Sequence, residues 1–88
     1  MNYLIRCIAD HYGPKIQIDK TVEELSELIR ALVRHDKANT IEEIADVEVM
    51  LEQIKYLLLI PDKELENWKM NKIQRTLGQI KEEKKGRR

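Results

Sequence analysis

Two short acidic groups at helical spacing each lie on a segment that also carries a regular apolar pattern. Residues 23–27 read EELSE and residues 43–46 read EIAD. A carboxylate among apolar neighbours costs free energy unless it is paired or binds a cation. Carboxylate oxygens suit Mg²⁺ or Mn²⁺, and such an ion can polarise a phosphoryl oxygen and activate water. These residues could therefore support metal-assisted hydrolysis of phosphates.

The acidic residues differ in direction when each segment is drawn as a helix at about 100° per residue. On the first segment, Glu24 lies at the border of the apolar stripe and Glu27 lies just beyond it, whereas Glu23 points farther toward water. On the second segment, Glu43 projects nearly into the middle of the apolar face and Asp46 lies at its edge. If the two helices pack antiparallel, the two inward-facing acidic pairs can converge.

These carboxylates also have purely structural explanations. Thr40 and Glu43 have the spacing of a capping box, in which Glu43 would bond a backbone N–H instead of a metal ion. Glu23 could pair with Lys20 or Arg30 on the surface of a helix. Both explanations stay open here, although only one role can dominate at Glu43.

The elements that must position these residues are helices with short connections. Gly13-Pro14 separates two helical segments, Thr40 is the expected N-cap of a third, and Asp62 is the expected N-cap of a fourth. The predicted spans are 2–12, about 15–34, about 41–59 and 62–80. We expect an all-α, four-helix-bundle-like domain over residues 1–80, followed by a polar, frayed tail over residues 81–88.

Length and composition indicate one small domain of amphipathic helices. The chain has 88 residues, of which 36% are charged and 42% hydrophobic, and its formal net charge is zero. Balanced charge gives no general attraction to nucleic acid or membrane, and residues 81–88 lack the aromatic side chains of a nucleic-acid binder. The single cysteine, Cys7, cannot form an internal disulfide, and the N-terminus lacks the pattern of a signal peptide. We expect a cytoplasmic protein that binds neither nucleic acid nor membrane.

The paired motif, EExxE on one helix and ExxD on the next, resembles the MazG-like all-α nucleoside triphosphate pyrophosphohydrolases. The matching text lies in residues 17–29 and 42–53, and the resemblance covers roughly residues 12–80. It is closest to the small, single-domain type of phages and Gram-positive bacteria. The resemblance implies hydrolysis of a (deoxy)nucleoside triphosphate to the monophosphate and pyrophosphate, in nucleotide-pool control or house-cleaning.

The resemblance also implies roles for individual acidic residues. It assigns the metal ligands to the four residues that the helical projection selects, which are Glu24, Glu27, Glu43 and Asp46. Mg²⁺ is the expected ion, with Mn²⁺ as an alternative. Glu23 matches the first Glu of the motif, so Glu23 and Glu24 are the candidate catalytic residues. Glu23 would act beside the metal or as a base.

Basic residues on the last helix are implied to contact the phosphates. Lys72 and Arg75 match this position, and Lys20 has a similar status, because such charges stabilise a transferring phosphoryl group. These residues could instead form a solvated basic face. Trp68 could stack on a base, or it could be a core residue of an amphipathic helix.

An oligomer is expected because the third segment is apolar on two sides. Ala45, Val49 and Tyr56 form a strip away from the main apolar face, and a helix that is apolar on two sides is buried on two sides. The second side could pack on another subunit. The resemblance implies a homodimer with a shared four-helix core, or a homotetramer built as a dimer of dimers.

Two other functions stay open. A non-catalytic helical module that binds nucleotide or drives oligomerisation would explain the short chain. Phosphoribosyl-ATP pyrophosphohydrolase has a similar length and a similar KxxEExxE pattern, but the continuation ADVEVMLEQ at residues 45–53 fits the MazG-like type better.

Overall fold

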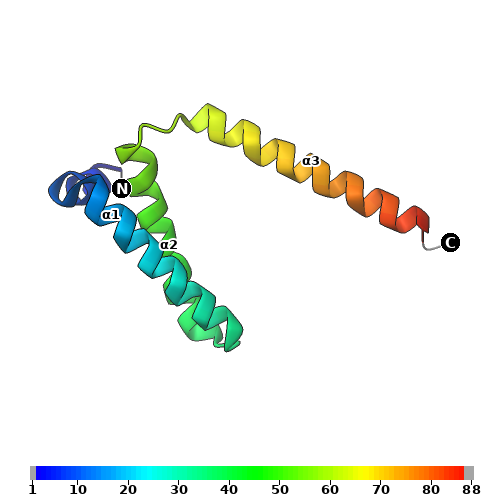
Figure 1. Cartoon of the computed structure of the whole chain (residues 1–88), viewed down its shortest axis with the longest axis horizontal. Helices are drawn as coiled ribbons and strands as arrows, with labels where there is room; N and C mark the ends of the chain where they lie inside the picture. The colour runs from blue at the N-terminus through cyan, green and yellow to red at the C-terminus, as the bar shows by residue number, and fades with distance from the viewer. Residues whose placement is uncertain (1, 87–88) are drawn as a thin grey trace.

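The computed structural model of the protein describes residues 2–86, and every element in this range is a helix (Figure 1). The helices are α1 (Asn2–Val33), α2 (Lys37–Leu57) and α3 (Asp62–Gly86). The predicted all-α class is confirmed. None of these helices contains a stretch that is both long and apolar enough to cross a bilayer.

α1 consists of two helical segments that meet at Gly13. This residue has a φ of 82° and a ψ of 170°, in the left-handed region that glycine adopts without strain, and Pro14 suits the first turn that follows. The predicted break is confirmed. The N-terminal segment turns back beside the C-terminal end of α2 (Figure 1), where the Tyr56 hydroxyl donates a hydrogen bond to Asp10 Oδ1 at 2.8 Å. Tyr56, expected in the strip that faces a second subunit, therefore contacts its own chain.

The turn between α1 and α2 starts α2 earlier than predicted. His35 has a φ of 54°, the left-handed conformation that commonly ends a helix. Asp36 is the N-cap of α2, because its Oδ1 accepts a hydrogen bond from Asn39 N at 3.1 Å. Thr40 lies inside the helix, and its hydroxyl donates to the Asp36 carbonyl at 2.7 Å. The predicted capping box of Thr40 and Glu43 is therefore wrong, because Asp36 already provides the cap.

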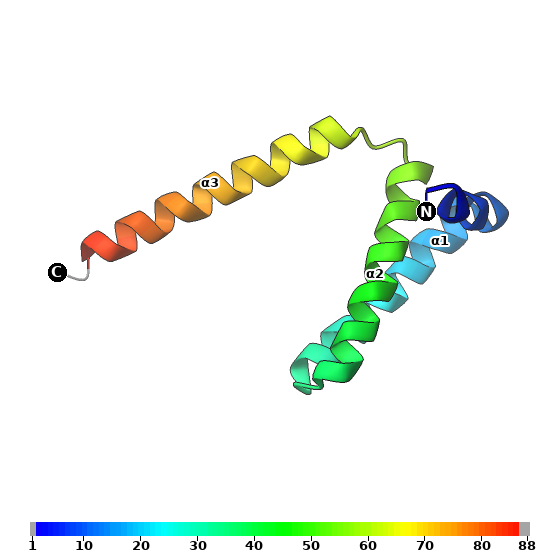
Figure 2. The same cartoon turned by 180° about the vertical axis from the view of Figure 1, so that it is seen from behind.

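The second segment of α1 packs antiparallel against α2 (Figures 1 and 2). We call this segment together with α2 the α1·α2 pair. Small and polar side chains fill much of its interior. The buried residues are Gln17, Thr21, Ala31, Val47, Met50 and Gln53, together with Ala9 on the N-terminal segment of α1. Gln17 Nε2 donates to Gln53 Oε1 at 2.7 Å across the two helices, which satisfies polar groups that burial would otherwise leave unpaired.

α3 packs against neither helix of the pair in the part of the chain that the structure describes, and it extends away from them in both views (Figures 1 and 2). It contains no buried residue. The expected bundle is therefore not closed within one chain, because the linker directs α3 away from the pair.

α3 also runs through residues 81–86, where a frayed tail was expected. The chain offers no proline there, and Lys85 pairs with Glu82 one turn away, with an N–O distance of 3.7 Å, which supports the helix slightly. Arg87 and Arg88 lie outside the described residues.

Candidate metal centre

Three of the predicted ligands meet between α1 and α2. Glu24 comes from α1, and Glu43 and Asp46 come from α2. One carboxylate oxygen of each lies within 4.8 Å of the others. Glu43 and Asp46 are three residues apart, so the helix presents them on one side. The antiparallel packing of α1 brings Glu24 opposite them. We call these three residues the acidic cluster.

Glu43 is the residue of the cluster that protein contacts do not satisfy. Its Oε2 is buried and has no hydrogen-bond partner in the described structure. Desolvation, followed by the charges of Asp46, Glu24 and Glu27, raises the pKa of the Glu43 carboxyl. Because α2 is capped by Asp36, the Glu43 carboxylate is not occupied by a capping role. A half-buried carboxylate with one oxygen buried and unpartnered is costly, and a bound cation would offset that cost.

Asp46 experiences the same crowding of negative charge. Desolvation and the neighbouring Glu24 raise the pKa of the Asp46 carboxyl, while Lys20 opposes the shift. Perturbed carboxyl groups that face one another are a physical sign of a functional site. Two oxygens on one Mg²⁺ at about 2.1 Å lie at most about 4.2 Å apart. Small side-chain rotations would therefore bring the acidic cluster into coordination range.

Lys20 is a cation that contacts the edge of the cluster in the described structure. Its Nζ lies 3.2 Å from Glu24 Oε1 and 3.6 Å from Glu23 Oε1. The hydrogen bond to Glu24 is the main reason that the pKa of Lys20 is raised. One exposed lysine cannot neutralise three carboxylates. Glu23 itself points to solvent and lies outside the cluster, as the helical projection predicted.

Glu27, the fourth predicted ligand, does not belong to the cluster in this structure. Its Oε1 accepts a hydrogen bond from Arg30 Nη2 on the surface of α1. Its charge is nevertheless close enough to raise the pKa of Glu43. The structure thus brings together Glu24, Glu43 and Asp46 and leaves Glu27 paired one turn along the helix.

The predicted substrate-binding residues of α3 lie away from the cluster, because α3 does not pack on the α1·α2 pair. Trp68 is 56% exposed, so it is not a core residue of this chain. Lys72 Nζ lies 5.7 Å from the centroid of the Trp68 ring, at the distance of a cation–π contact. Arg75 follows on the same helix. Within one chain, these residues do not meet the acidic cluster.

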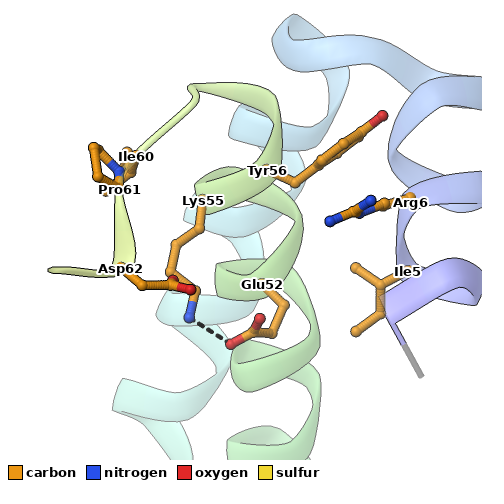
Figure 3. Close-up of a pocket in the computed structure, with 8 residues that line it drawn as sticks. All are labelled: Ile5, Arg6, Glu52, Lys55, Tyr56, Ile60, Pro61 and Asp62. Atoms are coloured by element: carbon orange, nitrogen blue, oxygen red, sulfur yellow. Dashed lines mark ion pairs between the residues drawn. The ribbon is translucent and has the colours of Figure 1, made fainter.

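A cavity of about 340 Å³, which no sequence pattern predicted, lies between the N-terminal segment of α1, the end of α2 and the α2–α3 linker (Figure 3). Its lining residues are Ile5, Arg6, Glu52, Lys55, Tyr56, Ile60, Pro61 and Asp62. The Arg6 guanidinium lies 5.3 Å from the Tyr56 ring centroid, and Lys55 Nζ lies 2.6 Å from Glu52 Oε1. Helical periodicity carries no signal for this cavity, because it depends on the bend at Gly13 and on the path of the linker.

Comparison with known proteins identifies one family. A sequence profile described as phosphoribosyl-ATP pyrophosphohydrolase matches residues 8–60, which is more than half of the chain. The matched region contains all four predicted metal ligands, whereas α3 lies outside it. No curated protein and no solved structure matches the chain significantly.

Proposed function

Since the chain belongs to the phosphoribosyl-ATP pyrophosphohydrolase family, which is of the MazG-like all-α type, we propose that it hydrolyses (deoxy)nucleoside triphosphates. The products are the monophosphate and pyrophosphate, and the role is nucleotide-pool control or house-cleaning. Pyrophosphohydrolase activity on a nucleotide follows from the family at the coarser level. The observation that supports metal-dependent hydrolysis is the unpaired, buried Glu43 Oε2 beside two further carboxylates. The choice of nucleoside triphosphates over phosphoribosyl-ATP rests on the continuation ADVEVMLEQ at residues 45–53.

The acidic cluster would hold a divalent ion, and such metal dependence is general in this family. Mg²⁺ is the ion that we propose, with Mn²⁺ as an alternative, because the ligands are hard oxygens. When bound, the ion supplies Lewis acidity to phosphoryl oxygens and to water. Glu27 would join the other ligands by leaving Arg30, which is a change of side-chain rotamer on the surface of α1.

Glu23 and Glu24 have separate tasks in this proposal. Glu24 would hold the ion, and Lys20 lies 3.2 Å from its carboxylate and would help to orient it. Glu23 points to solvent in this structure, and it would accept a proton from the attacking water after its side chain rotates toward the cluster. The water oxygen adds to phosphorus, the anhydride bond between the α- and β-phosphates breaks, and pyrophosphate leaves.

The basic part of α3 would bind the substrate. Residues 67–81 contain Lys69, Lys72, Arg75 and Lys81 and no acidic residue. Lys72 and Arg75 would contact the phosphates, whose negative charge grows on the leaving group. Exposed Trp68, one turn before Lys72, would stack on the base. This role requires α3 to approach an acidic cluster in the assembled protein.

A homodimer, or a dimer of such dimers, would cover an apolar side of the α1·α2 pair. Exposed apolar residues recur on α1 at spacings of four and three, namely Ile18, Val22, Leu25, Ile29 and Leu32. On α2 and its C-cap residue the corresponding stripe consists of Ile41, Ile44, Leu51 and Leu58. Each stripe lies roughly 100–120° around its helix from the packed residues, in the same rotational sense. Because the helices are antiparallel, both stripes lie on one side, which we call the dimer face.

Pyrophosphate release from a panel of NTPs and dNTPs with Mg²⁺ tests the proposal. Loss of a ligand in Glu43→Gln should lower kcat/KM by at least about 100-fold, because even residues outside the first coordination shell cost about 10–100-fold. Glu48→Gln is the matched control, since Glu48 is an exposed carboxylate on the same helix. Activity that survives Glu43→Gln would exclude the metal assignment.

The same panel separates the alternative functions when phosphoribosyl-ATP is added. Turnover of phosphoribosyl-ATP alone would favour the alternative enzyme. No turnover of any substrate would favour a non-catalytic nucleotide-binding or oligomerisation module.

A further inference from the structure

Gln17 and Gln53 join the two helices of the α1·α2 pair through a buried hydrogen bond. Gln17 is 4% exposed and Gln53 is 1% exposed, and Gln17 Nε2 donates to Gln53 Oε1 at 2.7 Å. Within residues 2–86, this is the one side-chain hydrogen bond between the second segment of α1 and α2. The ion pairs of these two helices each join residues of a single helix. The directional contact between the helices is therefore concentrated at this point.

The Gln53 amide is oriented by its own helix. Its Nε2 lies 3.5 Å from the Val49 carbonyl oxygen and 3.5 Å from Met50 Sδ, which leaves its Oε1 to accept from α1. On α1, the Thr21 hydroxyl donates to the Gln17 carbonyl at 2.6 Å, so this hydroxyl is already used within its helix. A displacement of one helix against the other would leave both buried amides without a partner, and such groups are costly.

This hydrogen bond requires the same alignment of the helices as the acidic cluster. Gln17 precedes Glu24 by seven residues, and Gln53 follows Asp46 by seven residues. In antiparallel helices, equal steps in opposite sequence directions reach facing residues, and seven residues are close to two turns. The interhelical hydrogen bond and the approach of Glu24 to Asp46 therefore need the same axial position and the same rotation of α1 and α2.

The acidic cluster lies between two links that join the helices. The turn over residues 34–36 connects them at one end (Figure 1), and the Gln17–Gln53 hydrogen bond joins them on the other side of the cluster. The carboxylates do not hold the helices together themselves, because like charges that face each other repel. Apolar contacts such as those of Val47 and Met50 are not directional, whereas a buried polar group can fix the alignment of packed helices.

We infer that the Gln17–Gln53 hydrogen bond positions the acidic cluster by fixing the alignment of α1 and α2. Both glutamines are positioning residues and lie two turns from the carboxylates that they align. Two ligands of one Mg²⁺ lie at most about 4.2 Å apart, so a displacement of about 1 Å is enough to weaken the site. The effect on metal binding rests on the proposed function, whereas the alignment of the helices does not.

Mn²⁺ binding to the full chain tests the effect on the cluster without any activity, since electron paramagnetic resonance measures unbound Mn²⁺ directly. Gln17→Leu/Gln53→Leu removes both polar groups, so urea denaturation of the same samples should show a stability close to that of wild type. Its Mn²⁺ affinity should nevertheless fall at least about tenfold, because residues that orient metal ligands contribute about 10–100-fold. Gln17→Met/Gln53→Met, with side chains closer in shape to glutamine, replaces this variant if the leucine variant does not fold.

Thr21→Val is the matched control. Thr21 is 7% exposed, and its hydroxyl bonds to a carbonyl within α1. The substitution therefore removes a buried hydrogen bond of the pair and keeps the contact between the helices, so Mn²⁺ affinity should equal that of wild type. Wild-type affinity in the double glutamine variant, or an equal loss of affinity in Thr21→Val, would overturn the inference.

The alignment itself is measured by electron–electron double resonance between nitroxide labels at Asp19→Cys and Lys37→Cys, and in a second sample at Asp19→Cys and Glu48→Cys. All three positions are exposed, and Cys7→Ser removes the native thiol. Dilution with unlabelled protein restricts the measurement to distances within one chain. The chain with both glutamines should give narrow distance distributions without metal, and the double leucine variant should give broader or shifted ones.

Unchanged distributions in both labelled samples of the double leucine variant would overturn the inference. If wild type binds no Mn²⁺, the proposed metal site fails, and these distances alone decide whether the hydrogen bond fixes the alignment.

Discussion

The α1·α2 pair and α3 differ in how much of their structure one chain can complete. The pair has a buried interior, an interhelical hydrogen bond between Gln17 and Gln53, and three converging carboxylates. α3 has no buried residue and no packed neighbour. The half of the site that would hold metal is thus formed by a single chain. The half that would bind phosphates, on α3, does not meet the acidic cluster within one chain.

This division also affects the electrostatics of the cluster. Basic residues that lay permanently against Glu24, Glu43 and Asp46 would compete with a metal ion for the same oxygens. Lys20 at the edge contacts Glu24 and leaves Glu43 Oε2 unpaired. The cations of α3 are kept away within the chain. Within one chain the acidic cluster therefore retains the negative charge that favours a divalent cation.

The largest expected difference between the two regions is in amide hydrogen exchange. At protein concentrations below the dimer dissociation constant, amides of α3 should exchange at least about 100-fold faster than those of residues 47–53, because an unpacked helix opens readily. Raising the concentration should slow the exchange of α3 and leave the pair nearly unchanged. If the amides of α3 are as protected as those of the pair at every protein concentration, the two regions do not differ in how much of their structure one chain completes.

The sequence predicted the local features of the pair well, because they depend on neighbouring residues. Gly13 marks the break in α1, and the projection of Glu24, Glu43 and Asp46 onto one side follows from helical geometry. The capping box failed, because Thr40 and Asp36 are both good caps and spacing alone does not choose between them.

The arrangement of α3 and the cavity near Tyr56 could not be read from periodicity. The direction of α3 depends on the left-handed Leu59 and on contacts of the linker with the N-terminal segment. An apolar stripe indicates that a helix face is buried, but it does not say whether the partner lies in the same chain. The pairing of Glu27 with Arg30 likewise reflects a competition between neighbours that sequence spacing permits but does not decide.

Metal binding should stabilise the pair, and we expect this change in the free energy of unfolding to be the second largest effect after the difference in amide exchange. Mg²⁺ at about 100 times its dissociation constant should raise the free energy of unfolding by about 2.7 kcal/mol. Glu43→Gln should abolish that gain and should stabilise the metal-free protein, because it removes one negative charge from the crowded, half-buried acidic cluster. Thermal denaturation at fixed protein concentration, with EDTA or with Mg²⁺, measures both effects. Glu48→Gln should behave like wild type, and an equal Mg²⁺ response in Glu43→Gln would remove Glu43 from the site.

Substitutions at Gln17 and Gln53 test whether their buried hydrogen bond stabilises the α1·α2 pair. Gln53→Leu leaves the buried Gln17 amide without its acceptor and should cost about 2 kcal/mol of unfolding free energy in urea denaturation. Gln17→Leu/Gln53→Leu should recover much of that loss, because both polar groups are gone. Gln74→Leu, on exposed α3, should change stability by less than about 0.5 kcal/mol. If the double variant is no more stable than Gln53→Leu, the hydrogen bond is not the source of the cost.

The smallest expected effect is the pH dependence of the metal-free pair, because the cluster lies near solvent and salt screens its charges. The pKa values of Glu43 and Asp46 are raised above their ordinary values of 4.5 and 3.8. The folded state therefore binds protons more tightly than the unfolded state, so these groups lower the free energy of unfolding as pH rises from those values toward neutrality. The difference between wild type and Glu43→Gln/Asp46→Asn in denaturation at several pH values isolates this contribution.

Mg²⁺ should reverse the sign of this pH dependence. The ligands must be deprotonated to bind the ion, so stabilisation by Mg²⁺ grows over the same range in which the metal-free cluster loses stability. Mg²⁺ should not change the pH dependence of α3, because its apolar stripe of Met70, Ile73, Leu77 and Ile80 contains no carboxylate. Amide exchange of residues 70–80, measured at a protein concentration at which the dimer is fully formed, provides this internal reference. Parallel pH profiles for wild type and the double variant, with and without Mg²⁺, would mean that the carboxylates are adjacent but do not act as one site.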